Sequence, residues 1–401
     1  MQAEVPLPPF AAFDYHPRTQ LVFGPGCVGR VGELARSLGA KRVLLVTDAG
    51  LVIAGHAARV EHALQAAGLG AVTYDRVREN PTTRDVDQCL VVAREAAVDF
   101  LVGLGGGSSM DTAKGCNFIL TNGGQMKDYW GVGKATKPML PFIAIPTTAG
   151  TGSECQSAAL IADEHTHQKM ACLDPKAAAR IALLDPQLTV SQPPRVTACT
   201  GIDAIAHAVE TAVTKKRNPL SLMFSHEAFK LCVASFARVM SHPLDEEARG
   251  RMLLGAAFAG LAIENSMLGA AHAAANPLTA HFNVVHGQAV GLMLPHVVRF
   301  NAHEPAARRA YAELASAPEI ACLSDGESQA VEALVARLEK LLNVAIMPRS
   351  LAECGVKREW IPTLAEEAAK QWTAGFNPRR VAAEDFAKLY EAAFEPRGDG
   401  A

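Results

Sequence analysis

Residues 101–114 read Leu101-Val-Gly-Leu-Gly-Gly-Gly-Ser-Ser-Met-Asp-Thr-Ala-Lys114, and this stretch decides the fold of the first half of the 401-residue chain. Its apolar beginning favours a strand, and the three glycines at 105–107 lead into a helix that we expect to begin near Ser108 or Ser109. Glycines let the backbone approach a ligand, and a helix N-terminus offers free N–H groups to a phosphate. The stretch is not a Walker loop, and serine at 108 breaks the Gly-x-Gly-x-x-Gly pattern. A nucleotide site and a plain tight turn both fit these residues.

Short apolar runs at 42–47, 71–74, 99–104 and 141–145 alternate with helical patterns in the first half of the chain. Continuous apolar strands between helices predict a parallel sheet that is covered on both faces. The first half is therefore expected to be an α/β domain.

Strand signals stop after residues 193–194, both proline, and alanine- and leucine-rich helical periods follow. Ser324 with Glu327 resembles a capping box that opens a helix whose apolar face includes Val331 and Leu338. We expect two domains, an α/β domain at 1–190 and an all-helical domain at 191–401, with a cleft between them.

Composition narrows the class of protein. The chain is 49% hydrophobic and 20% charged, which is typical of a soluble globular protein. A net charge of −3 without a basic block gives no reason to expect nucleic acid or an anionic membrane as a partner. Nine scattered cysteines without Cys-x-x-Cys favour reduced thiols in the cytoplasm. The N-terminus does not resemble a secretory signal, and the apolar run at 252–263 is too short to span a bilayer.

Four residues in the second half form a candidate metal site. Asp203 and His207 lie four residues apart in an alanine-rich stretch, so both side chains share one helix face. His272 lies in another helix-favouring run, and we expect His286 on a turn. One carboxylate and three imidazoles suit Fe(II), Zn, Co or Ni better than Mg or Ca. The Asp203 and His207 pair alone also fits an ion pair on a helix surface.

Two further features fit a dinucleotide. Asp48 ends the strand at 43–47, where a carboxylate can accept from ribose hydroxyls and repel a 2′-phosphate, which favours NAD over NADP. An N-cap role explains Asp48 equally well. Residues 145–154, Ile-Pro-Thr-Thr-Ala-Gly-Thr-Gly-Ser-Glu, follow an apolar strand with hydroxyls and glycines that can line a ligand site.

The stretches at 105–114, 146–154, 201–210 and 286–287 occur in an order that closely resembles the iron-containing (group III) alcohol dehydrogenases, over about residues 23–300. The resemblance implies a Rossmann-like parallel-sheet dinucleotide domain and a C-terminal helical metal-binding domain, as in the dehydroquinate synthase-like fold. It also implies NAD(H), a divalent metal with Fe(II) preferred to Zn, a small alcohol or carbonyl substrate, and a homodimer or larger homo-oligomer.

The resemblance assigns roles to particular residues. The metal ligands of the family fall on Asp203, His207, His272 and His286. Its cofactor contacts fall on Asp48, Asn80, Gly106, Gly107, Ser108, Thr147, Thr148 and Lys169, the last of which also reads as an exposed lysine.

Asn276 is a departure, because many family members carry a histidine there. An amide does not titrate near neutral pH, so a proton relay through this position is lost, although Asn276 can still orient an alcohol or a water. His281 is the other candidate catalytic residue, as a substitute base, and a structural histidine is the alternative.

The expected activity is hydride transfer between an alcohol and NAD, with the metal activating the substrate oxygen. Four rival readings stay open: a metal-independent reductase like maleylacetate reductase, a hydroxyacid-oxoacid transhydrogenase, a lyase like dehydroquinate synthase, and a non-catalytic metal- or nucleotide-binding protein.

Overall fold

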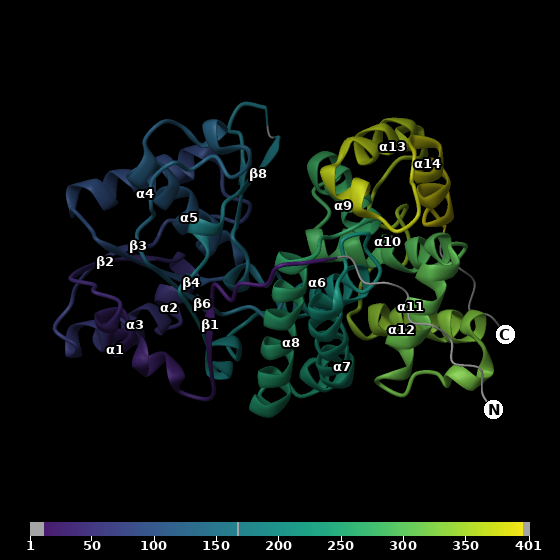
Figure 1. The fold of residues 1–401 in the computed structure, drawn as a ribbon, viewed down its shortest axis with the longest axis horizontal. Helices are drawn as coiled ribbons and strands as arrows, with labels where there is room; N and C mark the ends of the chain where they lie inside the picture. Colours follow the sequence, from purple (N-terminus) through teal and green to yellow (C-terminus); the bar gives the residue numbers. More distant parts are fainter. Residues whose placement is uncertain (1–11, 167, 396–401) are drawn as a thin grey trace.

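A computed structural model of the chain describes residues 12–166 and 168–395, and it contains two lobes of different architecture (Figure 1). The N-terminal lobe contains a parallel sheet with helices around it, and the C-terminal lobe is helical. The predicted fold class, α/β followed by all-α, is confirmed. The last strand of the sheet ends at Leu184 and the first long helix of the second lobe begins at Pro194, so the expected boundary at residue 190 lies between them.

The main sheet has six strands in the order β1-β9-β6-β4-β2-β3, and every neighbouring pair is parallel. The strands are β1 (Gln20–Phe23), β2 (Arg42–Val46), β3 (Gly70–Tyr74), β4 (Phe100–Gly105), β6 (Phe142–Pro146) and β9 (Ile181–Leu184). The four strands expected from the sequence are β2, β3, β4 and β6. Strand β4, which leads into the glycine loop, lies between β6 and β2, inside the sheet.

Apolar residues on both sides of each strand explain why the sheet is covered on both faces. Along β2, Val43 and Leu45 enter one hydrophobic core, and Leu44 and Val46 enter a second core on the other face. The helices of this lobe are α1 (Val31–Ser37), α2 (Ala49–Ile53), α3 (His56–Ala66), α4 (Thr83–Glu95) and α5 (Gly107–Asn122). Residues of α1 and α3 belong to the first core, and residues of α4 and α5 belong to the second.

A small second sheet, with the order β5-β8-β7, extends this lobe. Its strands are β5 (Gly131–Val132), β7 (Ala158–Ala162) and β8 (Lys169–Leu173). Strand β8 pairs parallel with β5 and antiparallel with β7. Packing of β7 against α5 attaches this sheet to the lobe and places Lys169 at the start of β8.

The helical lobe packs closely because small residues line its helix contacts. A Cβ on Gly201 would lie 2.5 Å from the Phe236 ring, and a Cβ on Gly255 would lie 2.5 Å from the sulfur of Cys232. The helices are α6 (Pro194–Thr211), α7 (Pro219–Ser241), α8 (Glu246–Asn265), α9 (Ala270–Phe282), α10 (His286–Asn301), α11 (Pro305–Ser316), α12 (Glu327–Val344), α13 (Ile361–Lys370) and α14 (Ala383–Ala392). Within 12–166 and 168–395, no single helix is long and apolar enough to cross a membrane; α8 and α9 pass that test only together, with a bend of 105° between them.

One expectation about this lobe is wrong. Helix α12 begins at Glu327 with Gly326 as its N-cap, and no side chain caps it. Ser324 lies in the preceding 3-10 helix, η6 (Leu323–Asp325), because the left-handed turn at Gly326 (φ 98°) separates it from the start of α12. The apolar face of α12, including Val331 and Leu338, is buried as expected.

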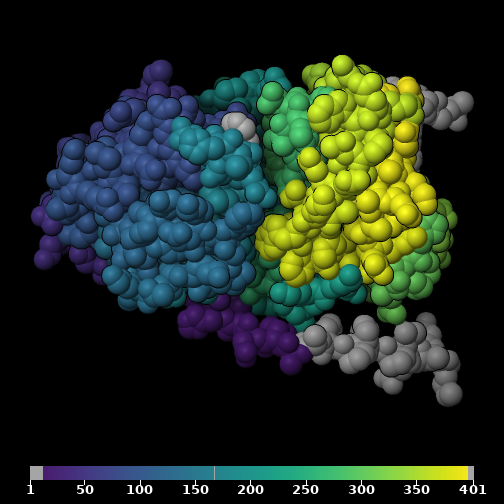
Figure 2. Space-filling model, turned by 90° about the horizontal axis from the view of Figure 1, so that it is seen from above, coloured from purple at the N-terminus to yellow at the C-terminus, as the bar shows by residue number. Residues whose placement is uncertain are grey.

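The two lobes meet at the loop that follows β6, and Figure 2 shows them side by side. Gly152 in this loop (φ 62°) lies directly against Gly260 of α8, where a Cβ on Gly260 would lie 2.4 Å from the Gly152 carbonyl oxygen. Glu264, also on α8, accepts from the Ser157 N–H at 2.9 Å and from its hydroxyl at 2.8 Å. Close backbone contact and hydrogen bonds therefore hold the loop on the helical lobe.

We predict that Gly260→Ala destabilises the protein by about 1–3 kcal/mol, because the new methyl group must push the Gly152 backbone away. Urea denaturation measures the effect. Gly29→Ala is the matched control, since a Cβ at Gly29 has no neighbour within 4 Å. Equal denaturation midpoints for Gly260→Ala and wild type would contradict the described contact.

Candidate functional site

The glycine loop forms an uncapped helix N-terminus at the end of β4. Gly106 is the N-cap of α5, no side chain caps the helix, and Gly105 has φ 146°. A Cβ on Gly105 would lie 2.3 Å from the Ser109 hydroxyl, and a Cβ on Gly107 would lie 3.0 Å from the Thr151 side chain. Only glycine fits at Gly105, and the first N–H groups of α5 remain free to bind an anion.

Residues from three loops gather around this N-terminus. The N–H of Asn80, a left-handed residue (φ 53°), donates to the Ser108 hydroxyl at 3.3 Å. The N–H of Thr147 donates to the Gly105 carbonyl at 3.0 Å, and a Cβ on Gly106 would lie 3.3 Å from the Thr148 side chain. The structure thus brings together six of the cofactor candidates: Asn80, Gly106, Gly107, Ser108, Thr147 and Thr148.

Asp48 caps α2. Its Oδ1 accepts from the Leu51 N–H at 3.1 Å, so Asp48 has the N-cap role that was one of the two expectations for it. Leu51 in turn lies beside the glycine loop, since its side chain would be 3.2 Å from a Cβ on Gly105. Asp48 is therefore near the loop while one of its oxygens is already engaged.

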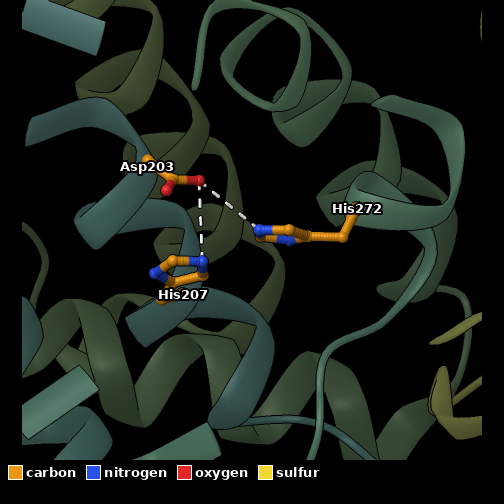
Figure 3. Close-up of side chains that lie close together, drawn as sticks. All are labelled: Asp203, His207 and His272. Atoms are coloured by element: carbon orange, nitrogen blue, oxygen red, sulfur yellow. Dashed lines mark ion pairs between the residues drawn. The ribbon is translucent and has the colours of Figure 1, made fainter. Parts of the chain in front are cut away.

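The four candidate metal ligands converge on one carboxylate oxygen. The Oδ1 of Asp203 lies 3.5 Å from Nε2 of His207, 3.5 Å from Nε2 of His272 and 3.9 Å from Nε2 of His286. Figure 3 shows Asp203 and His207 on one helix, α6, with His272 approaching from another. His286 is the first residue of α10, so three helices supply the side chains, and the expected turn at His286 is wrong.

Small residues explain the convergence. A Cβ on Gly287 would lie 2.1 Å from the Cys199 carbonyl oxygen, so the start of α10 rests on the backbone of α6. A Cβ on Gly150 would lie 2.5 Å from Thr200, so the loop after β6 reaches the same helix. The site therefore lies at the junction of the lobes.

The chemistry of the cluster fits a divalent cation. Asp203, His207 and His272 are buried, and each offers a ligand atom within 4.8 Å of the others. Asp203 Oδ1 and His272 Nε2 are buried and have no hydrogen-bond partner among residues 12–166 and 168–395. Buried polar atoms are normally satisfied, and one oxygen with several imidazole nitrogens is a common donor set for Zn or Fe. These residues could hold a metal ion.

Charges inside the cluster shift the pKa values strongly. Burial raises the pKa of Asp203, but the surrounding His207, His272 and His286 rings outweigh it and hold this pKa well below its usual range. Burial lowers the pKa of His272, but the carboxylates of Glu210 and Asp203 outweigh burial and raise it to about 9. Burial lowers the pKa of His207, and it lowers that of His286 to about 3. Metal binding requires an ionised carboxylate and imidazoles with free lone pairs. The lowered pKa values of Asp203, His207 and His286 fit this requirement, whereas His272, with its raised pKa, must lose a proton to bind a metal.

Lys169 brings a positive charge from the N-terminal lobe to this site. Part of Lys169 is exposed to solvent, yet the protein atoms packed around it desolvate its charge and lower its pKa. The carboxylates of Asp111 and Asp203 oppose that effect. Its charge also lowers the pKa of His286. These electrostatic effects link Lys169 to Asp203 and His286 among the metal candidates and to Asp111 on α5.

The two catalytic candidates have different surroundings. Asn276 lies one turn after His272 on α9 and donates from Nδ2 to Gln371 at 3.0 Å. His281 lies nine residues after His272, about 13.5 Å along the helix and on roughly its opposite face. Its Nε2 lies 2.8 Å from the carboxylate of Glu367. The four-residue spacing places Asn276 on the same face of α9 as His272, whereas His281 lies on roughly the opposite face.

Sequence reasoning missed the role of Glu210, although it ends the stretch 201–210. Its carboxylate lies 2.6 Å from Nδ1 of His272. Glu210 lies seven positions after Asp203, which is almost two helical turns, so the spacing already placed both carboxylates on one face of α6.

A buried polar network under the glycine loop was also missed. Lys114 Nζ donates to the Ser153 carbonyl at 2.7 Å and to the Ser153 hydroxyl at 2.9 Å, and that hydroxyl donates to Asp111 at 3.0 Å. Glu154 is 1% exposed, and its Oε1 has no hydrogen-bond partner among the residues that the structure describes. Burial raises the pKa of Glu154 to about 7, although its own backbone N–H and Lys114 oppose the shift.

Both lobes match one protein family. Residues 17–186 match the family described as iron-containing alcohol dehydrogenase, and residues 197–394 match the Fe-containing alcohol dehydrogenase family, C-terminal. The chain belongs to the iron-containing alcohol dehydrogenase family. It is therefore an oxidoreductase of the alcohol dehydrogenase type, and the resemblance inferred from the sequence is confirmed.

Individual relatives align with this chain over nearly its full length. Alcohol dehydrogenase 4 of Schizosaccharomyces pombe is 35% identical over 386 residues, which are 96% of this chain and 89% of that protein. The NAD-dependent methanol dehydrogenase of Bacillus methanolicus is 34% identical over 372 residues, 93% of this chain and 97% of that protein. The crystal structure of a 1,3-propanediol oxidoreductase matches with a TM-score of 0.92 at 32% identity, covering 96% of this chain and 100% of that chain.

We predict that Glu154→Gln changes the pH dependence of stability. The pKa of Glu154 is about 7 in the folded protein against an ordinary value of 4.5, so the wild-type free energy of unfolding falls as pH rises from 4.5 to 7. Glutamine does not titrate, so the stability of the variant relative to wild type should rise by up to about 3 kcal/mol over this range. Urea denaturation of both proteins at pH 5 and pH 8 measures it. A stability difference that is the same at both pH values would contradict the prediction.

Proposed function

We propose that this protein is a metal-dependent, NAD(H)-linked alcohol dehydrogenase that also reduces the corresponding aldehydes or ketones. The observation that carries the proposal is the position of the Asp203 cluster, which faces the lobe that contains the glycine loop. The positive charge of Lys169, in that lobe, lowers the pKa of His286. Gly150 of the same lobe packs on the helix that carries Asp203. Membership of the family supports the reaction class, and one relative is named as NAD-dependent.

Four side chains hold the metal in this proposal: Asp203, His207, His272 and His286. The unpartnered Oδ1 of Asp203 and Nε2 of His272 support the assignment. The donor set accepts Fe(II), which the family name favours, and also Zn.

The dinucleotide binds across the N-terminus of α5 in this proposal. Backbone N–H groups at the start of the helix are suited to a pyrophosphate, and the remaining contacts flank them. The proposed contacts are Asp48, Asn80, Gly106, Gly107, Ser108, Thr147, Thr148 and Lys169. Residues 1–190 then form the dinucleotide-binding domain and residues 191–401 the metal-binding domain.

When bound, a divalent ion would polarise the substrate oxygen as a Lewis acid, and NAD(H) would supply the hydride acceptor or donor. The side chains of the protein orient the reactants. Asn276, held by Gln371, can donate a hydrogen bond to the substrate oxygen or to a water, but its amide does not take up a proton. His281 is held by Glu367 away from the cluster, so we assign proton exchange to water instead. The substrate is a small alcohol or carbonyl compound, and a homodimer or larger assembly stays a prediction.

Anaerobic assays of NAD⁺ reduction with a panel of alcohols test the proposal, using metal-free protein before and after addition of Fe(II) or Zn(II). Activity that requires the metal supports it. Metal-independent activity would instead indicate a reductase like maleylacetate reductase. Hydride exchange between two organic partners without turnover of free NAD would indicate a transhydrogenase.

We predict that His272→Ala lowers turnover by roughly 100-fold or more, because one metal ligand is lost from a site that must hold the ion during chemistry. Metal content by elemental analysis and steady-state kinetics measure the effect, with circular dichroism as the test of folding. His303→Ala, which removes an exposed histidine, is the control and should change neither quantity. Retained metal and unchanged turnover in His272→Ala would contradict the ligand assignment.

Asp48→Asn separates the capping role of Asp48 from its charge. Asparagine caps a helix about as well as aspartate, so α2 should persist. Loss of the charge should reduce repulsion of a 2′-phosphate and raise the ratio of kcat/KM for NADP⁺ over NAD⁺ by roughly tenfold. An unchanged ratio with unchanged thermal stability would show that Asp48 only caps the helix.

A further inference from the structure

Glu210 reaches from α6 to the helix that carries His272. The residue is 2% exposed, and its Oε2 lies 2.6 Å from Nδ1 of His272. Oε1 accepts from the Ala271 N–H at 2.7 Å, and Oε2 also accepts from the Gly269 N–H at 3.2 Å. One buried carboxylate therefore receives three contacts from residues 269–272, at the N-cap and first turn of α9.

We propose that Glu210 is a positioning residue that keeps the Nδ1 of His272 protonated and thereby leaves Nε2 as the metal-binding atom. This inference rests on the proposed metal site and names the group that prepares one of its ligands. An ionised carboxylate only accepts hydrogen bonds, so the His272 nitrogen at 2.6 Å must carry the hydrogen. The opposite ring nitrogen, Nε2, faces Asp203 and has no hydrogen-bond partner in the described part of the chain.

The local backbone favours a carboxylate at this position. A Cβ on Gly269 would lie 3.1 Å from Oε1 of Glu210 and 3.0 Å from Oδ1 of Asn377, so glycine permits both side chains to approach the helix start. The two N–H groups of the backbone cannot change from donor to acceptor, whereas an imidazole can. Any group at 210 that donates to His272 would therefore move the ring hydrogen to Nε2 and remove the metal-binding lone pair.

Capping of α9 is a separate role, and Asn377 provides a control for it. Its Oδ1 accepts from the Ala270 N–H at 3.2 Å, one residue from the N–H groups bound by Glu210. Asn377 has no contact with His272 among the described hydrogen bonds of the two residues. Loss of Asn377 thus weakens the same helix start without changing the partner of His272.

The experiment compares Glu210→Gln with Asn377→Ala. In Glu210→Gln, the amide oxygen can keep the 2.7 Å bond from Ala271, which turns the NH₂ group toward His272. The dissociation constant for Zn(II), measured by competition with a chromophoric chelator, should rise roughly 10- to 100-fold. The visible spectrum of the Co(II)-loaded variant should also change. Asn377→Ala should leave the affinity within about threefold and the Co(II) spectrum unchanged, even where thermal stability falls.

Glu210→Asp gives a second measurement if the glutamine variant folds poorly. It keeps an acceptor-only side chain, so it should bind Zn(II) more tightly than Glu210→Gln. Equal affinities of wild type and Glu210→Gln, equal losses in Glu210→Gln and Asn377→Ala, or weaker binding in Glu210→Asp than in Glu210→Gln would each overturn the role of Glu210 alone. Wild-type protein that binds no Zn(II) would overturn the proposed metal site, and the role of Glu210 with it.

Discussion

The Asp203 carboxylate is buried on α6, and three imidazole rings surround its Oδ1 atom at 3.5, 3.5 and 3.9 Å. A buried carboxylate without a compensating positive charge costs several kcal/mol. Neutral imidazoles do not supply that charge. The positive charge that Asp203 needs comes either from a protonated imidazole or from a divalent cation bound by the same atoms. His272 is the ring whose pKa is raised. The buried Asp203 carboxylate therefore requires a cation at this point of the helical lobe.

Glycine residues let the surrounding segments pack closely around Asp203. Gly287 lets α10 rest on the backbone of α6, which brings His286 to Asp203. Gly150 and Gly152 let the loop after β6 pack on α6 and α8, which brings the N-terminal lobe to the same place. In each case a Cβ would lie less than 3.0 Å from backbone or side-chain atoms, so a larger residue would separate the two halves of the site.

Local patterns explain the successful and the unsuccessful predictions. The strands β2, β3, β4 and β6 were found because apolar runs of four to six residues between helices are a local signal. The edge strand β1 was missed, and its pairing with β9 joins residues about 160 positions apart. The expected capping box at Ser324 failed because Gly326, which has a positive φ, is the N-cap of α12 two residues after Ser324. Capping and turns depend on backbone angles that residue types only bias.

The spacing of Asp203, His207 and Glu210 on one helix face follows from the sequence alone, because the α-helix has a fixed 3.6-residue period. The same holds for the glycines that open α5. The tertiary structure decided which distant groups meet these residues: His272 with Glu210, 62 positions apart, His286 at the start of α10, and Lys169 from the other lobe. It also decided that Asn276 meets Gln371 and that His281 meets Glu367. Helix periodicity is set by bonds between near neighbours, whereas these contacts depend on how whole helices pack.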